Sequence, residues 1–484
     1  MKKLMLVCLA LLCLFAGCRK DSKKPSGRSD WKPPETEAEE EWTGPTVTVA
    51  YADRLDEVHQ SRLTKFEKDE GVKIIALDYS EYNTSFNPTA GRDKLALDMV
   101  TGTVKPDLVI TPSTRETVAV TMLEKKLYQD LTPFLDADDT VNRDTVFGAI
   151  LELYTADDGA LWGITEQFTV ETIIGNDALL GKYAGQSGWT LDDFLDLAES
   201  LPEDVVLIPS LSQQIASEII FGVYGYSAFF DRSAGTCSFD SPTFVRYLSF
   251  LRSLPATWEE LRAQSPYDDL PSAEKYEYAF NNRLALANRL YVNMGLLTSD
   301  SSVFGTDAYT RIGYPDTAGY AFCPTTDWTY MIGAEAENPD AAWKIIRAFF
   351  EPTRAADTGR VIWSGGLPVL KNLFDVAVQQ TLDQTFFLYF SGGGGAVTKD
   401  PEHPFTEADL TEPGFVYEFT EEDAARFREQ FDSRNVRRIA DRIPSEVEAI
   451  VTEEISALLG GKSTPETCAS AIQSRATLWL EEHK

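Results

Sequence analysis

The chain has 484 residues, a formal net charge of −32, three histidines and six cysteines that lack metal-site or disulfide-framework spacing. This length is too great for one hydrophobic core and predicts two domains or lobes. The acidic balance disfavours nucleic acid, anionic lipid headgroups and polyanionic ligands. The few histidines argue against a histidine-based metal site or catalytic triad, so we expect no metal and no cofactor.

The N-terminal sequence has the features of an export signal. Lys2 and Lys3 precede a dozen apolar residues, 4–15, which is too short for a membrane-spanning helix of about 20 residues. Residues 1–17 are therefore predicted to be a signal peptide. The ending LFAGC (14–18) resembles a bacterial lipobox, which implies that Cys18 becomes a lipidated N-terminus. The alternative is an ordinary secretory signal with an incidental cysteine.

The next segment is predicted to be a tether. Residues 19–45 are rich in Lys, Ser, Pro, Glu and Gly and contain almost no apolar residue besides two tryptophans. Such a composition buries too little surface to fold. Residues 18–45 are thus expected to form a lipidated cysteine and a flexible leash. We expect the protein to be extracytoplasmic and lipid-anchored to the membrane of a bacterial cell.

The first folded elements alternate between strand and helix. The pattern predicts strands at 45–53, 72–80 and 106–112 and helices at 55–71 and 92–105. This order indicates a mainly parallel sheet with helices on its faces. Ligands bind outside the carboxyl ends of the strands in such sheets. Those ends carry Tyr51, Asp53 and the segment 111–115.

Helical patterns dominate the later chain, after an extended run at 163–174. Residues 190–203 are predicted to be an amphipathic helix with a capping box between Thr190 and Asp193, and 241–254 and 338–352 are predicted helices. Residues 447–483 are expected to form two helices separated at Gly460. Cys237, Cys323 and Cys468 remain beyond the N-terminal segment. We expect three buried thiols there, with one disulfide and a free thiol as the alternative.

Several motifs occur in a familiar order. They are FEKDEGVKI (66–74), KPDLVI (105–110), GALWGITEQFTVETIIGND (159–177), ENPDAAWKIIRAFF (337–350) and EEISALLGGKSTPETCASAIQSR (453–475). Together they resemble the extracellular solute-binding proteins of ABC importers, in the sugar-binding group like maltose-binding protein. The resemblance covers about 46–480 and is weak over 204–310.

The resemblance implies an α/β, two-lobed, type II periplasmic-binding-protein fold with a ligand cleft between the lobes. It places lobe 1 at 46–164 plus 328–375 and lobe 2 at 165–327 plus 376–484. The expected function is to capture a carbohydrate, in particular an oligosaccharide, and to deliver it to the permease subunits of an ABC transporter. We expect a monomer.

Aromatic and polar side chains near the strand ends and lobe crossings are the candidate ligand contacts, because aromatic rings stack on sugar faces while carboxylates and arginine bind hydroxyls. Core packing is the alternative for Trp162, a plain surface loop for Tyr51 and Asp53, and pairing with Glu116 for Arg115. The predicted set is Tyr51, Asp53, Arg115, Trp162, Glu166, Tyr291, Trp328 and Trp363.

Other function classes remain open. The sequence contains no GxSxG, HExxH, Walker or Rossmann glycine motif, so we expect no enzyme. A transport receptor for polyamines or peptides is one alternative, since carboxylates opposite aromatic rings would bind a cation. A sensor or adhesin lipoprotein of the same fold is another.

Overall fold

A computed structural model describes residues 42–483, apart from 113–122, 124, 218–224, 293–295, 297–299, 307, 316–322, 327, 357–358, 363–364, 392 and 433–435. The described residues from 44 onward form one compact unit. The predicted signal peptide and Cys18 lie outside the described residues. No helix within the described ranges has the length and apolar character needed to cross a membrane.

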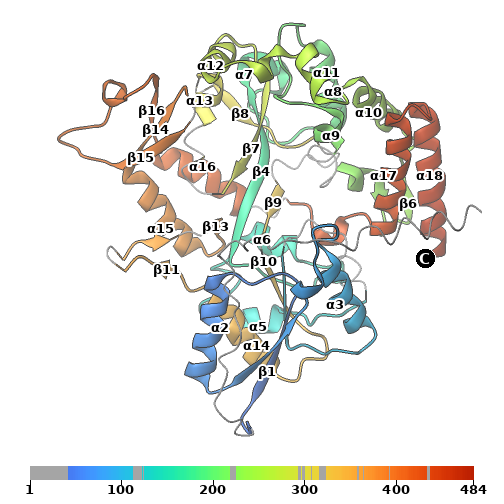
Figure 1. Ribbon diagram of the computed structural model, residues 1–484, viewed down its shortest axis with the longest axis vertical. Coiled ribbons are helices and arrows are strands. Elements are labelled where there is room, and N and C mark those ends of the chain that lie inside the picture. The colour runs from blue at the N-terminus through green and yellow to red at the C-terminus, as the bar shows by residue number, and fades with distance from the viewer. Residues whose placement is uncertain are drawn as a thin grey trace, which may run out of the picture. The chain divides into compact units, whose positions relative to one another are not determined.

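The first sheet follows the predicted alternation. Its strands are β1 (Thr46–Tyr51), β2 (Lys73–Asp78), β3 (Leu108–Pro112) and β10 (Trp328–Ile332), in the order β10-β3-β1-β2. β1 pairs in parallel with β2 and β3, whereas β10 returns from far along the chain and pairs antiparallel with β3. Figure 1 shows this sheet beside its first helices. The helices around it are α2 (Glu57–Glu70), α3 (Ala90–Val100), α5 (Thr132–Ala137), α6 (Gly148–Leu153) and α14 (Pro339–Phe349).

The predicted helix boundaries are confirmed to within a few residues, and their ends have clear causes. Helix α2 begins after Asp56, whose side chain accepts the backbone N–H of His59, and ends at Gly71 in the left-handed conformation. The capping box between Thr190 and Asp193 is present at the start of α8 (Leu191–Ser200). Local signals in the sequence therefore fix these ends.

The second sheet is built around one long strand. β4 (Gln167–Asn176) pairs antiparallel with β7 (Leu286–Tyr291), β8 (Tyr309–Arg311), β9 (Cys323–Thr325) and β13 (Leu367–Pro368). The predicted parallel arrangement therefore applies to the first sheet, while every pairing described for the second is antiparallel. Helices around it are α7 (Asp177–Leu180), α9 (Gln213–Ile215), α10 (Pro242–Ser253), α11 (Trp258–Gln264), α12 (Ser272–Phe280), α13 (Asp300–Phe304), α17 (Ser445–Leu459) and α18 (Pro465–Glu482).

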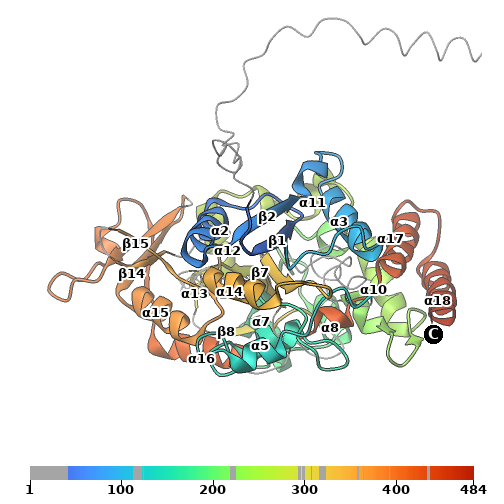
Figure 2. The same cartoon turned by 90° about the horizontal axis from the view of Figure 1, so that it is seen from below.

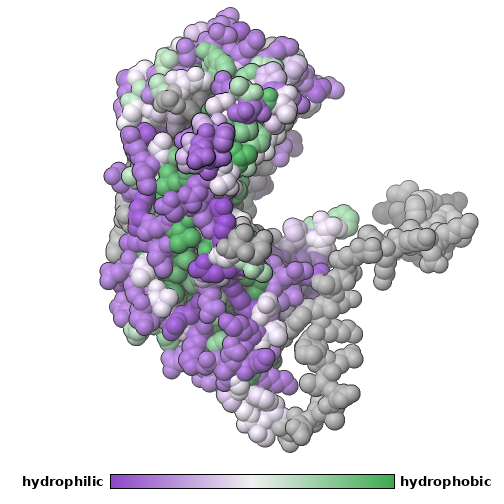
Figure 3. All heavy atoms as spheres, turned by 90° about the vertical axis from the view of Figure 1, so that its left-hand side faces the viewer, coloured by the Kyte–Doolittle hydropathy of each residue, from purple (hydrophilic) through white to green (hydrophobic). Residues whose placement is uncertain are grey.

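Small sheets and two further helices complete the described chain. β14 (Gln384–Tyr389), β15 (Gly394–Thr398) and β16 (Gly414–Glu418) form a three-stranded antiparallel sheet. Figures 1 and 2 show this sheet and the α17–α18 pair on opposite sides of the molecule. Figure 3 views the side of β14–β16, where apolar side chains lie between polar ones. The remaining α-helices and strands are α15 (Lys371–Leu382), α16 (Glu421–Asp432), and the pairs β5 (Phe230–Asp231) with β6 (Thr236–Cys237) and β11 (Thr353–Arg354) with β12 (Val361–Ile362).

Two main hydrophobic cores lie on these sheets, and β4 contributes to both. Phe168 and Val170 belong to the core of the first sheet, and Ile173 belongs to the core around α8, α10, α17 and α18. The α/β prediction is therefore confirmed. Cys237 and Cys468 are free thiols, and burial raises the pKa of Cys468 to about 12.

Candidate functional site

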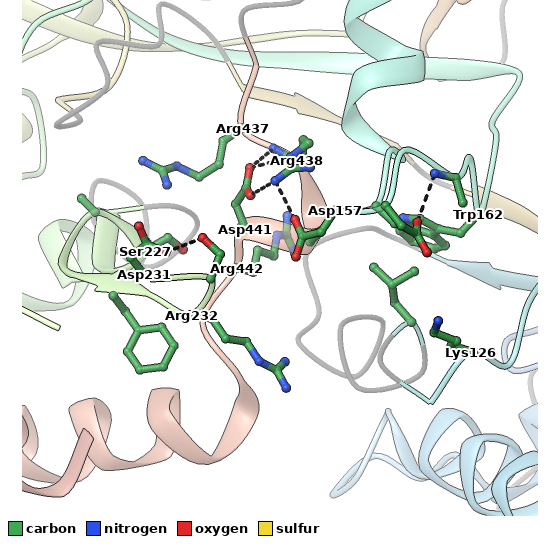
Figure 4. A pocket seen from close by; sticks show the side chains of 18 of the residues that line it. Lys126, Asp157, Trp162, Ser227, Asp231, Arg232, Arg437, Arg438, Asp441 and Arg442 are labelled. Carbon is green, nitrogen blue, oxygen red and sulfur yellow. Dashed lines mark hydrogen bonds and ion pairs between the residues drawn. The ribbon is translucent and has the colours of Figure 1, made fainter. Parts of the chain in front are cut away.

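A cavity of about 990 Å³ lies between three stretches of chain that are distant in sequence. Its walls come from residues 123–162, which connect β3 to β4, from 227–238, which include the β5–β6 hairpin, and from 437–442. Figure 4 shows these walls and their side chains. The volume lies within the range of small-molecule sites, about 300–1,000 Å³. It is large enough for more than one sugar ring.

One wall of the cavity is aromatic. Trp162 is only 3% exposed, stacks on Tyr128 with ring centroids 6.1 Å apart, and meets Tyr154 edge-on at 5.2 Å. Its indole Nε1 has no hydrogen-bond partner among the residues that the structure describes. A buried donor without a partner is costly in a folded protein. Trp162 is thus fixed by its neighbours, and its buried indole donor stays unsatisfied among the described residues.

An ion-pair bridge connects two of the walls. Arg438 Nη2 lies 2.9 Å from Asp157 Oδ1 and 2.6 Å from Asp441 Oδ1, as the dashed lines in Figure 4 show. Hydrogen bonding to Asp441 and the charge of Asp157 raise the pKa of Arg438, against an opposing effect of burial. This bridge holds the turn before Trp162 against the segment 437–442.

The end of β1 forms a separate polar cluster. Asp53 accepts a hydrogen bond from Asn83 Nδ2 at 2.6 Å and lies 3.6 Å from Arg92. Burial raises the pKa of Asp53, and Arg92 and Asn83 oppose this shift. Tyr51 is 5% exposed, and burial, followed by Asp78, raises the pKa of its hydroxyl. The strand end therefore places both predicted residues in a packed, hydrogen-bonded setting.

Glu166 and Trp328 lie together at a second, smaller pocket of about 70 Å³. Glu166 lies 3.9 Å from His59 Nε2, which shares a 2.6 Å hydrogen bond with the hydroxyl of Tyr330. The Trp328 ring is 5.0 Å from the imidazole. Burial raises the pKa of Glu166, and the charge of His59 is the largest opposing effect. The pocket joins α2, β10 and the segment that leads into β4.

The other predicted residues have different placements. Tyr291 is fully buried, donates a 2.6 Å hydrogen bond to Asp300 Oδ2 and lines neither pocket. Arg115 and Trp363 lie outside the described residues. Of the predicted set, the large cavity therefore contains Trp162, the small pocket contains Glu166 and Trp328, and Tyr51 and Asp53 lie at neither.

Sequence reasoning missed the basic side chains of the cavity. Lys126, Arg232 and the segment Arg437–Arg442 line it. A signal was available, because SRNVRRIADR (433–442) concentrates arginine in a strongly acidic chain. No cluster of histidine, cysteine and carboxylate side chains suited to a metal ion occurs within the described ranges.

No protein-family model and no curated protein matches this chain. Among solved structures it is similar to an ABC substrate-binding protein from Listeria monocytogenes in complex with cycloalternan, with 15% identity, 90% and 99% of the two chains covered and a TM-score of 0.47. It is also similar to a cyclic alpha-maltosyl-1,6-maltose binding protein from Arthrobacter globiformis (16%, 91% and 100%, 0.46) and to the sugar-binding protein MalE from Xanthomonas citri (13%, 90% and 98%, 0.47).

Proposed function

We propose that the protein is an extracytoplasmic receptor that captures a carbohydrate, in particular an oligosaccharide, and delivers it to the permease subunits of an ABC transporter. The observation that carries this proposal is the cavity of about 990 Å³ with Trp162 in its wall and charged side chains around it. A sugar has apolar ring faces and a belt of hydroxyls, and these walls offer an aromatic surface and hydrogen-bonding groups for both.

The walls also suit a receptor that opens and closes. They come from the connection between β3 and β4, from the β5–β6 hairpin, and from the segment 437–442 just before α17. A ligand that contacts all three stretches would draw them together, because it binds the closed arrangement better than the open one. A permease would then recognise the loaded, closed receptor.

The N-terminal segment supplies the membrane attachment in this proposal. Lipid on Cys18 would hold the receptor at the membrane, and residues 19–45 would act as its leash. Tethering raises the local concentration of the receptor beside its permease without any new contact.

The test is thermal melting of the purified full chain with oligosaccharides, amino acids, polyamines and peptides. Ligand at 100 times its Kd stabilises the folded state by about 2.7 kcal/mol. We expect a shift with one class of sugar and none with amino acids. If only polyamines or peptides shift the melting temperature, the ligand is not a carbohydrate, and the proposed transport role still holds. If no compound in the panel shifts the melting temperature, a sensor or adhesin role is favoured instead.

A further inference from the structure

Basic side chains are concentrated at the large cavity, although the chain as a whole is strongly acidic. The chain has 44 lysines and arginines against 76 aspartates and glutamates, whereas the cavity wall has five of each sign. The local balance is therefore neutral in a protein whose net charge is −32. The basic members of the wall are Lys126, Arg232, Arg437, Arg438 and Arg442.

The acidic side chains of the wall already serve the protein itself. Each of the five accepts at least one hydrogen bond that holds a turn or forms part of the Arg438 bridge. These contacts are Asp130 with the N–H of Leu161 (2.9 Å), Asp158 with the N–H of Ala160 (3.2 Å), Asp231 with the N–H of Ala234 (2.8 Å), and Asp157 and Asp441 with Arg438 (2.9 and 2.6 Å).

The basic side chains retain capacity for an anion. A guanidinium group has five N–H donors in a planar fork, so an arginine that is already bound within the protein can also contact an anion. In Figure 4, Lys126 and Trp162 lie on one side of the cavity, and Arg232, Arg437 and Arg442 lie on the other. Arg442 is only 5% exposed. Charge–charge attraction is stronger at such a partly dehydrated wall than in water.

We propose that the ligand is an anionic carbohydrate, whose carboxylate or sulfate group is bound by the arginines of this wall and whose ring contacts Trp162. The inference rests on the proposed function and names the class of its substrate. It departs from the expectation that the overall acidity of the chain disfavours polyanionic ligands. Salt at physiological strength screens distant charges beyond about 8 Å, so the groups that line the cavity decide which charge binds there.

The experiment is isothermal titration calorimetry on the full chain with three probes: trigalacturonate, a chondroitin sulfate disaccharide and neutral maltotriose. Arg437→Gln and Lys126→Gln remove one charge each from opposite sides of the cavity. Arg143→Gln is the matched control, because Arg143 is 43% exposed, pairs with Asp136 at 2.7 Å and does not line the cavity.

We expect at least one anionic probe to bind about 10-fold or more tightly than maltotriose, and the affinity to fall with added sodium chloride. Arg437→Gln should weaken that probe about 10-fold, with a smaller loss for Lys126→Gln and none for Arg143→Gln. A preference for the uronate identifies a carboxylate as the recognised group, and a preference for the disaccharide that also carries sulfate identifies sulfate.

Three results would overturn the inference. If maltotriose binds as tightly as the anionic probes or more tightly, the protein is a carbohydrate receptor but its ligand is not specifically anionic. Binding of an anionic probe that none of the cavity variants weakens would place the anion elsewhere. Silence with all three probes, together with silence of the wider sugar panel, would reject the proposed function and this inference with it.

Discussion

Trp162→Phe separates a ligand contact from simple packing. The substitution keeps an aromatic ring against Tyr128 and Tyr154 but removes the indole N–H, which has no hydrogen-bond partner among the described residues. In the free protein two effects oppose each other. Loss of an unsatisfied buried donor relieves about 1–3 kcal/mol, and the smaller ring loses about 1–2 kcal/mol of burial.

The stability of the free protein should therefore change by no more than about 2 kcal/mol. Ligand affinity should fall by about 0.5–1.5 kcal/mol if the N–H donates to the bound sugar, which is a loss of about 2- to 12-fold. Trp162→Ala is the contrasting variant, because truncating a buried tryptophan costs about 3–5 kcal/mol of stability. Melting in the absence of ligand and calorimetric titration give the two quantities independently.

One result would refute this reasoning. If Trp162→Phe leaves the affinity unchanged while Trp162→Ala merely destabilises the fold, Trp162 is a packing residue. The sugar must then stack elsewhere, and the aromatic wall no longer supports the proposed site.

Three further substitutions test the structure around the site. Glu166→Gln should stabilise the protein above pH 7 by about 1–3 kcal/mol and have little effect near pH 4. Burial raises the pKa of Glu166 above its ordinary 4.5, so the native state binds the proton more tightly than the unfolded state, and the free energy of unfolding of the unsubstituted protein falls as the pH rises from 4.5 through the raised pKa. Urea unfolding at several pH values checks this, and a stability difference that is constant across pH contradicts it. Gly333→Ala would place a Cβ 2.1 Å from the carbonyl oxygen of Pro106, and it should lower the stability of the fold by about 3 kcal/mol or more because it separates β10 from β3. Gly460→Ala is the control: its Cβ would meet no atom closer than 3.2 Å, so thermal melting should show a much smaller loss of stability. Cys18→Ala should release the protein from the membrane fraction without weakening ligand binding, and a loss of affinity would show that Cys18 is more than an anchor.

Local signals in the sequence were sufficient for the strands and helices of the first sheet and for helix α8. Apolar periodicity, Gly71 after α2 and the Thr190–Asp193 box each act within a few residues, so their outcome does not depend on the rest of the fold. The second sheet was different. The extended run before residue 174 predicts a strand, but its partner β7 begins at Leu286, and nothing local specifies that pairing or its direction.

The site was harder to predict for the same reason. Trp162 was predicted as a ligand contact because it lies in a motif beside the strand that enters the second sheet. Arg437 and Arg438 come from a segment that begins 275 residues after Trp162, and only folding brings them to the same cavity. Tyr291 shows the other limit: its position on a strand is correct, but the pattern does not reveal that its ring faces the core and its hydroxyl binds Asp300.

The late return of β10 has a consequence for biosynthesis. One edge of β3 stays without its partner until residues 328–332 emerge, and β3 itself ends at Pro112. At about 5–20 residues per second, ribosomes need about 10 to 40 s to make the intervening chain. During that time the first sheet is incomplete. Strand β4 contributes residues to both cores, so its packing cannot stabilise either core until the missing partners are made. Nascent chains should therefore remain sensitive to protease until well past the middle of translation, and the two halves should acquire resistance together.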